Sequence, residues 1–241
     1  AGANAGGFAS VAVGMGAYTA TETSGVSSTG VPSVALAEGT TALGSNAMVR
    51  AKAFSSPSSA DPGVAIASGS TAVGWGSRVD AFGMDGHTAT ATHALAMNAA
   101  TVSADARNGG AQVDRSIALG VYSKVEAISD TSFSGAVNTT EHTSAQDAIA
   151  IGREATVSAD NRKLSSGVIA LADNAVVIGT NAKAVTGGLI HNVSNTVTIG
   201  TDAVANGDAS ITIGHGAGVG GATDANYSTG DNLALGRSAG T

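Results

Sequence analysis

The sequence contains no cysteine, and aromatic and charged residues are scarce. Without cysteine the chain can form neither a disulfide framework nor a metal site built on thiolates. Aromatic residues make up 3% of the 241 residues and charged residues 12%, although large side chains dominate ordinary cores. The chain must therefore pack its backbone closely or complete its core with further copies of itself.

Basic residues and long apolar runs are also few. Eleven Lys and Arg residues against 18 Asp and Glu residues give a formal net charge of −7. The chain has no basic patch with interleaved aromatic residues, which argues against nucleic acid as a partner. No apolar run approaches the ~18 residues of a membrane helix, and the start of the sequence does not resemble a signal peptide. We therefore expect a soluble intracellular protein or an excised segment of a larger one.

Glycine, in contrast, is abundant, and a four-residue pattern recurs along most of the chain. The 34 glycines are about twice the usual ~7%. The pattern reads aliphatic, small, aliphatic, then a Gly or Ala that we call the anchor. It occurs thirteen times, as VAVG 11–14, VALA 34–37, TALG 41–44, VAIA 64–67, TAVG 71–74, HALA 93–96, IALG 117–120, IAIG 149–152, IALA 169–172, VVIG 176–179, VTIG 197–200, ITIG 211–214 and LALG 233–236.

The residues on both sides of the anchor alternate with a period of two. The residue before each anchor is Val, Leu or Ile, the third residue after it is Ala, Ser or Thr, and the fifth is Ala, Val or Thr. This period predicts two short strands, joined by a tight corner at the glycine. Positions −3, −1, +3 and +5 relative to the anchor are predicted to be buried.

The spacing of the anchors predicts the length of a coil. Anchors 37 and 44, 67 and 74, and 172 and 179 lie seven positions apart, anchors 200 and 214 lie 14 apart, and anchors 179 and 200 lie 21 apart. A half coil of seven and a full coil of 14 in a solenoid account for all five spacings. The remaining gaps are mostly longer and are rich in turn-forming residues, so we expect coils that carry surface loops.

These repeats resemble the head repeat of trimeric autotransporter adhesins, the YadA-like head, whose units read roughly N-S-V-A-I-G-x-x-S/A-x-A. The best single match is RSIALGVYS, residues 115–123, followed by SVAVGMGA, DAIAIGREA and ASITIGHGA. The resemblance extends over residues 10–239. It implies an all-β fold: a left-handed parallel β-roll of ~14-residue coils with loop insertions. Three chains would intertwine or pack side by side around an apolar axis as a homotrimer.

The same resemblance implies a function without catalysis or cofactor. Residues 1–241 would form a single head domain excised from a longer chain, without its neck, coiled-coil stalk and C-terminal membrane anchor. The whole protein would be exposed on the outer membrane of a Gram-negative bacterium and attached only through the absent anchor. Its partners would be a host extracellular matrix protein or a cell-surface receptor. The heavy looping departs from typical heads, so binding attributed elsewhere to smooth repeat faces does not transfer directly.

Two regions are candidates for ligand contact, although the sequence does not identify the ligand. The longest insertion, residues 126–147, contains Phe133, Glu141 and His142 among small polar residues. Insertions are free to vary and to carry recognition in a solenoid. The competing candidate is the repeat face from Ser116 to Ser123. Trp75 follows an anchor directly, and packing under a neighbouring loop is at least as good an interpretation as a ligand anchor.

Enzyme motifs in the sequence have structural interpretations. Gly216, Gly218 and Gly221 satisfy G-x-G-x-x-G but lie at a repeat corner and precede a poor helix former. GRSAG 236–240 satisfies the nucleophile elbow at Ser238, but the required Asp and His do not follow. The five histidines, His87, His93, His142, His191 and His215, show no metal-binding spacing, so no metal site is predicted.

The main alternative is a left-handed β-helix acyltransferase built from hexapeptide repeats. The segments IGTDAV and IGREAT fit such a hexapeptide locally. A hexapeptide helix requires aliphatic residues at multiples of six, whereas equivalent residues here differ by 7, 7 and 14. The period therefore favours a binding module over this enzyme.

Overall fold

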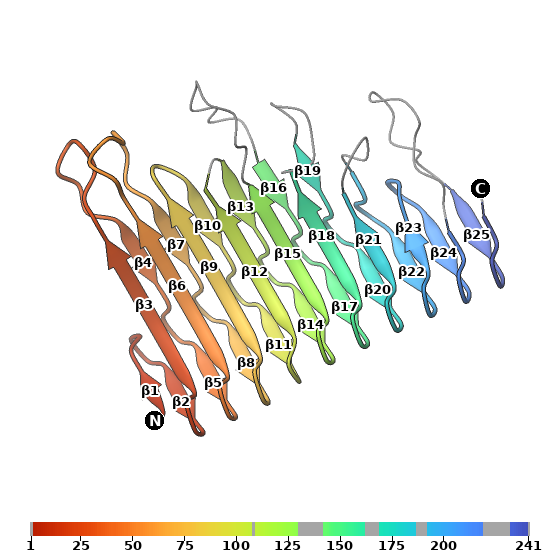
Figure 1. Cartoon of the computed structure of the whole chain (residues 1–241), viewed down its shortest axis with the longest axis horizontal. Helices are drawn as coiled ribbons and strands as arrows, with labels where there is room; N and C mark the ends of the chain where they lie inside the picture. The colour runs from red at the N-terminus through yellow and green to blue at the C-terminus, as the bar shows by residue number, and fades with distance from the viewer. Residues whose placement is uncertain are drawn as a thin grey trace.

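The computed structural model describes residues 2–107, 109–129, 142–161, 169–186, 192–218 and 232–240. Within these ranges the regular structure is β. The described residues include no helical segment with the length and hydropathy of a membrane span. The strands form three sheets, and all strand pairs in them are parallel. Figure 1 shows the strands stacked side by side along the molecule, with the two termini at opposite ends.

We call the sheets A, B and C, and their strands within the described ranges follow in order of pairing. Sheet A contains β1 (Asn4–Ala5), β3 (Tyr18–Ser24), β6 (Met48–Phe54), β9 (Arg78–Met84), β12 (Thr101–Ala106), β15 (Lys124–Ser129), β18 (Thr156–Asp160), β21 (Lys183–Val185) and β23 (Val204–Ala205). Sheet B contains β2 (Val11–Val13), β5 (Thr41–Leu43), β8 (Thr71–Val73), β11 (Leu95–Met97), β14 (Ile117–Leu119), β17 (Ile149–Ile151), β20 (Val176–Ile178), β22 (Val197–Ile199), β24 (Ile211–Ile213) and β25 (Leu233–Leu235). Sheet C contains β4 (Val34–Leu36), β7 (Val64–Ile66), β10 (Thr88–Thr90), β13 (Gly110–Gln112), β16 (His142–Ser144) and β19 (Ala170–Leu171).

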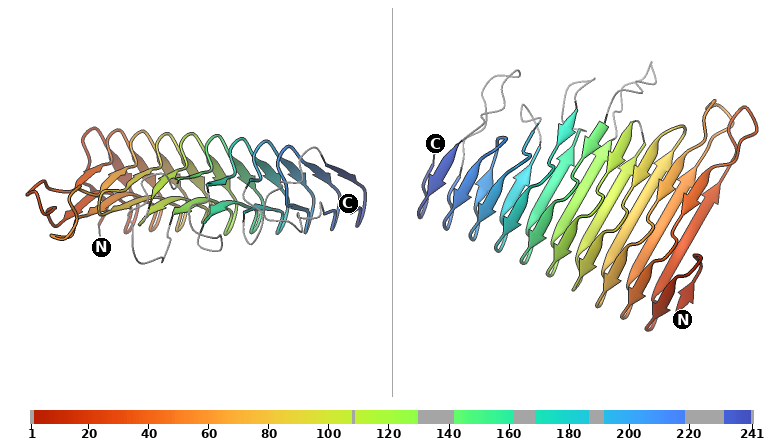
Figure 2. Two further views of the ribbon diagram at one scale, coloured as in Figure 1. Left: turned by 90° about the horizontal axis from the view of Figure 1, so that it is seen from above. Right: turned by 180° about the vertical axis from the view of Figure 1, so that it is seen from behind.

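One coil of the chain visits the sheets in a fixed order. In the middle of the molecule a strand of sheet C leads into sheet B, then into sheet A, and the chain returns to sheet C, as in β4, β5, β6 and β7. The two views of Figure 2 show the resulting flattened spiral. The predicted all-β parallel roll is confirmed.

Two short corners flank each strand of sheet B, and we name them by chain direction. The entry corner is the pair of residues that precedes the residue immediately before the strand, such as 146–147 before β17. The exit corner is the pair of residues that follows the anchor, such as 153–154 after β17. After β11 the corner is one residue shorter, and the pair 98–99 includes the anchor position. At the entry corner the second residue has positive φ in every described coil, for example Asp147 at 53°.

The interior of the roll is narrow and is filled by small side chains. Apart from Met48, every buried apolar residue in the described ranges is Ala or Val. One row of the interior comes from sheet A and stacks fully buried valines of consecutive coils, Val49, Val79, Val102, Val125 and Val157. Sheet B contributes a row of fully buried alanines, Ala42, Ala72, Ala96, Ala118 and Ala150. Such a thin interior leaves no room for aromatic rings, which explains their scarcity.

The anchor glycines allow successive corners to stack closely. Gly152 has φ of 128°, and a Cβ placed on it would lie 2.4 Å from the carbonyl oxygen of Gly179 in the next coil. Only glycine tolerates both this backbone conformation and this approach. The predicted tight corner at the anchor is therefore confirmed.

The predicted set of buried positions is only half correct for the single chain. Positions +3 and +5 are buried, as in Ala155 and Val157. Positions −3 and −1 point outward from sheet B, and Val11 and Val13 are 48% and 57% exposed. The residue between them, mostly Ala and in β20 the fully buried Val177, faces the interior instead.

The predicted coil length also needs correction. The predicted full coil appears in sheet B only between β22 and β24, where Val197 lies opposite Ile211. Between the other neighbouring strands of sheet B that are described, partner residues are further apart in the sequence, as are Ile117 and Ile149. Many of these longer coils contain a third strand, which lies in sheet C. Three of those strands, β10, β13 and β16, lie in segments with no aliphatic repeat.

In one copy of the repeat the sequence pattern places the anchor at the wrong residue. HALA 93–96 places the anchor at Ala96, but β11 is Leu95–Met97 and Ala96 is its buried middle residue. Leu95 and Met97 lie opposite Thr71 and Val73 of β8. Asn98 therefore takes the anchor position in this coil.

Candidate interaction surfaces

The outer face of sheet B is a continuous apolar stripe. Each of its ten described strands points its first and third residues outward. Of these twenty side chains, eighteen are Val, Leu, Ile or Met and two are Thr: Val11, Val13, Thr41, Leu43, Thr71, Val73, Leu95, Met97, Ile117, Leu119, Ile149, Ile151, Val176, Ile178, Val197, Ile199, Ile211, Ile213, Leu233 and Leu235. All twenty are exposed or half-buried. At ~4.8 Å per strand, nine steps give a length of ~43 Å. We call this surface the apolar stripe.

The outer face of sheet A has the opposite character. Asp80 accepts hydrogen bonds from Nε and Nη2 of Arg50, and the shorter of them is 2.6 Å. Arg78 reaches the same carboxylate at 2.9 Å, and the hydrogen bond to Asp80 raises the pKa of Arg50. Lys52 and Glu22 form a looser pair at 3.6 Å, with both side chains exposed. Opposite charges on neighbouring strands thus neutralise one another across this face.

A hollow of about 250 Å³ opens on the outer face of sheet A. Its floor lies over β12, whose outward residues Thr101 and Ser103 are small, while Phe82 of β9 and Ile128 of β15 form part of its walls. Arg107 lies over the ring of Phe82, 5.7 Å from its centroid. The hollow therefore offers hydroxyl, charged and apolar groups together, and it is absent from the sequence predictions. The sequence does contain a signal for the hollow: the outward residues Thr101 and Ser103 are small, whereas the neighbouring strands have the larger outward residues Phe82 and Ile128.

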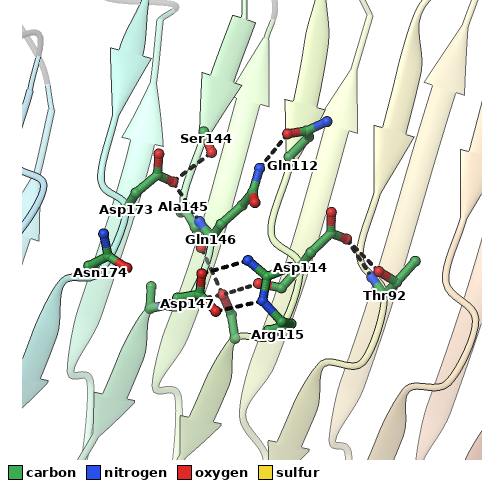
Figure 3. A network of polar contacts seen from close by, with 12 residues as sticks. Thr92, Gln112, Asp114, Arg115, Ser144, Ala145, Gln146, Asp147, Asp173 and Asn174 are labelled. Atoms are coloured by element: carbon green, nitrogen blue, oxygen red, sulfur yellow. Dashed lines mark hydrogen bonds and ion pairs between the residues drawn. The ribbon is translucent and has the colours of Figure 1, made fainter.

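A ladder of polar contacts runs along the entry corners beside sheet C (Figure 3). Asp114 accepts hydrogen bonds from N and Oγ1 of Thr92 at 2.9 and 2.8 Å. Asp173 accepts bonds in the same way from Oγ of Ser144 and N of Gln146, at 2.6 and 2.7 Å. Each carboxylate thus holds the corner of the preceding coil, and stacking of the coils is strengthened by side chains as well as by the main chain.

Arg115 and Asp147 form a two-point ion pair on this ladder. Nε and Nη2 of Arg115 lie 2.7 and 2.6 Å from the two oxygens of Asp147 (Figure 3). The hydrogen bond from Arg115 lowers the pKa of Asp147. Both side chains are largely exposed, at 58% and 42%, so the pair contributes little to folding and remains open to further contacts.

His142 does not lie in a loop, contrary to the prediction. It begins β16, which pairs with β13 and β19 in sheet C. Its Nε2 lies 3.2 Å from Oε1 of Gln112, and burial lowers its pKa. Main-chain pairing fixes this polar segment as a strand. Phe133 and Glu141 lie outside the described residues.

Ser116 and Ser123 are fully buried in the single chain, so the structure does not present their side chains to a ligand. Oγ of Ser116 donates to the carbonyl oxygen of Ala145 at 2.7 Å and accepts from N of Ala148 at 3.2 Å. It is therefore a structural bridge between coils. Oγ of Ser123 has no hydrogen-bond partner among the described residues. The outward residues of this repeat are Ile117 and Leu119.

Trp75 and the glycine-rich corner after β24 lie on the surface borders of sheet B. Trp75 is 64% exposed at an exit corner, so it does not pack under a loop there. Gly214 is the anchor after β24 and Gly216 lies at the exit corner that follows it, as predicted; Gly221 lies outside the described residues. In the described ranges no three His, Asp or Glu side chains gather closely enough to hold a metal ion.

Comparison with protein families identifies the repeat. Residues 144–161 match the family model described as the YadA head domain repeat, in two copies. The chain contains YadA head domain repeats. The matched segment runs from the end of β16 through the entry corner, β17 and the exit corner to β18. This YadA head segment includes two residues of the apolar stripe and the anchor Gly152, so the predicted resemblance is confirmed there. No curated protein matches the sequence.

Proposed function

We propose that the chain is the head of a trimeric adhesin exposed on the outer membrane of a Gram-negative bacterium. In this proposal it attaches the cell to host cells or extracellular matrix and performs no catalysis. The YadA head repeats in residues 144–161 support the class of protein. The observation that carries the proposal is the apolar stripe.

The stripe has the chemistry of a subunit interface. Soluble monomers rarely expose a long contiguous apolar surface, and none of the twenty outward side chains of the described sheet B strands is charged. The stripe is narrow, because each of these strands has only three residues. Three such narrow stripes can enclose one shared apolar axis, and this burial would complete the core of a chain whose own interior is built from Ala and Val.

The outer faces of sheets A and C would then point away from the axis and meet the ligand. The hollow over β12 is the best-formed candidate on sheet A, because it combines Phe82 and Ile128 with hydroxyl and charged groups. Three copies around the axis would present three hollows, and multivalent attachment raises the apparent affinity by ~10²–10⁴.

The mass of the purified protein tests the assembly. We expect a trimer with three times the chain mass of 23.0 kDa by light scattering at micromolar concentration. A stable monomer contradicts the proposal, and a dimer of twice the chain mass contradicts its threefold form.

A binding screen tests the function. The trimer is applied to immobilised collagen, fibronectin, laminin and glycans, and we expect saturable binding to at least one of them. Ser103→Tyr should then weaken binding by filling the hollow, whereas Thr156→Tyr, also outward on sheet A but away from the hollow, should not. Equal binding by both variants would exclude the hollow, and no binding to any surface would contradict the adhesin proposal.

The alternative of a hexapeptide acyltransferase finds no support in the register of the strands. Several pairs of partners in sheet B are not separated by a multiple of six, among them Val197 and Ile211, Val176 and Val197, and Ile117 and Ile149. A hexapeptide helix would keep every such separation at a multiple of six, so the coils are of another kind.

A further inference from the structure

The entry and exit corners border the apolar stripe on its two sides. Within a coil, the two corners are separated by one short strand of sheet B. The strands run across the direction in which the coils stack (Figure 1), so both corners of a coil lie at the same height along the molecule. In a threefold ring with the stripes turned to the axis, contacts between neighbours are head-to-tail. Each chain's entry corner then lies beside the next chain's exit corner in the same coil.

In two coils, a bulky apolar residue at the exit corner of one chain would face a glycine or another apolar residue at the entry corner of the next chain. In the coil of β8 the exit corner carries the exposed Trp75 and the entry corner carries Gly69. Gly69 has φ of 67°, and a Cβ on it would lie 2.9 Å from Cδ2 of His93 in the next coil of its own chain. Position 69 therefore presents no side chain of its own to a neighbouring chain. In the coil of β2, Phe8 and Met15 are both exposed, at 81% and 69%.

The charges of the two corners are also matched in two coils. In the coil of β17, Asp147 lies at the entry corner and Arg153 at the exit corner, and Arg153 is 67% exposed. Among the described residues its ion-pair contact is a loose one of 3.9 Å with Glu154. The coil of β24 has Asp208 at entry and the exposed His215 at exit.

The coil of β14 places a cation opposite an aromatic ring. Arg115 lies at its entry corner and Tyr122, 61% exposed, at its exit corner. Guanidinium groups pack favourably on aromatic faces, and the ion pair with Asp147 leaves Arg115 largely exposed. Matches of three kinds, in size, in opposite charge and between a cation and an aromatic ring, thus occur between the entry and exit corners of the same coil.

We infer that the two borders of the apolar stripe form a second, residue-specific contact between chains, in which each coil pairs with the same coil of its neighbour. The partner is a second copy of this chain, and the inference rests on the proposed trimer. The stripe alone is almost uniformly apolar and permits sliding along the axis. The corner pairs, Trp75 with Gly69, Arg153 with Asp147 and His215 with Asp208, fix the register.

Disulfide trapping tests the register, because the chain has no cysteine of its own. Asp147→Cys combined with Arg153→Cys should give a covalent trimer on oxidation. These positions flank an extended strand and lie roughly 15–20 Å apart, which is too far for a disulfide within one chain. The control combines Asp147→Cys with His215→Cys, three strands out of register and ~14 Å along the axis, and should give no covalent trimer.

The fluorescence of Trp75, the only tryptophan, gives a second readout. Its emission in the trimer should be shifted to shorter wavelength than in a monomeric variant such as Ile151→Asp, because the neighbouring chain covers it. The mass of each protein from light scattering distinguishes a failure of the corner contact from a failure of the proposed trimer. A trimer without trapping of the matched pair, or with unshifted Trp75 emission, overturns the corner contact and leaves the proposed trimer standing. A monomer overturns both.

Discussion

The outer faces of sheets A and B belong to the same coils and differ in almost every side chain. On sheet A, Arg50, Asp80 and Arg78 form a compact ion cluster, and more exposed pairs surround it. On sheet B, Val, Leu, Ile and Met occupy eighteen of the twenty described outward positions. The backbone of both sheets is the same parallel ladder, so the main chain does not cause the difference. The same main-chain ladder therefore carries a charged face on one side of the coil and an apolar face on another, and in the proposed trimer the apolar face is the one that is covered.

The largest expected effect comes from placing a charge in the apolar stripe. Ile151→Asp, or Ile199→Asp, should abolish trimer formation, because three carboxylates would be buried near one axis at a cost of several kcal/mol each. Val185→Asp is the matched control, since Val185 is also half-buried but points outward from sheet A. Light scattering should show a folded monomer for Ile151→Asp and a trimer for Val185→Asp. Equal masses for the two variants would remove the distinction between the faces.

A smaller effect is expected from the ion cluster of sheet A. Asp80→Asn should lower the free energy of unfolding by about 1–3 kcal/mol, because two arginines lose charged hydrogen bonds. The side chains of Asp80 and Arg50 are 14% and 23% exposed. Denaturant unfolding monitors the loss, and the trimer mass should stay unchanged. A dissociated trimer would mean that sheet A also contributes to assembly.

Acid should weaken the protein partly through His142 on sheet C. Burial lowers the pKa of His142 below its usual 6.5, while Asp173 opposes the shift. The unfolded chain therefore takes up the proton first, so the stabilising contribution is complete above pH ~6.5 and is lost as pH falls toward the folded pKa. His142→Gln should flatten the dependence of the melting temperature on pH between 5 and 7. An unchanged slope would assign the acid sensitivity to other groups.

The smallest effect is expected from the exposed pair of Lys52 and Glu22. Lys52→Ala should change the free energy of unfolding by no more than about 0.5 kcal/mol, because solvent screens this pair. The predicted value is the same for Glu141→Ala in the longest insertion. A thermal melt that showed Lys52→Ala to be as damaging as Asp80→Asn would contradict the ranking of contacts on sheet A, and one that showed this for Glu141→Ala would contradict the expected exposure of the insertion.

Much of the fold can be read from the sequence because repeats make local signals consistent. Strands such as 149–151, the corner at Gly152 and the buried pair at 155 and 157 follow from period-two alternation and one glycine. Half of sheet C is missing from the sequence predictions: β4, β7 and β19 lie in predicted repeats, whereas strands such as Gly110–Gln112 and His142–Ser144 have almost no aliphatic residues. They are strands because their main-chain groups continue a ladder formed by β7 and β10, and such pairing leaves no trace in the side-chain pattern.

The candidate site was predicted less well than the fold, and Ser116 shows why. Its hydroxyl resembles that of any surface serine in sequence, yet it bridges Ala145 and Ala148, which belong to the next coil. Only the stacking of coils separated by a long insertion brings these groups together. The hollow between Phe82 and Ile128 depends in the same way on three strands from three coils.

The sequence by itself determined where most of the chain forms strands and where it turns, because alternation and corner glycines are local properties. It also determined that one side of most sheet B strands is small and the other large. Only the tertiary structure decided which side is interior. Apart from Met48, the buried apolar side chains of the described residues are Ala and Val, so the alternation places the small middle residue inside and turns the residues at positions −3 and −1, which include Leu and Ile, outward. The repeat that looks like a core in sequence is therefore a surface in the single chain.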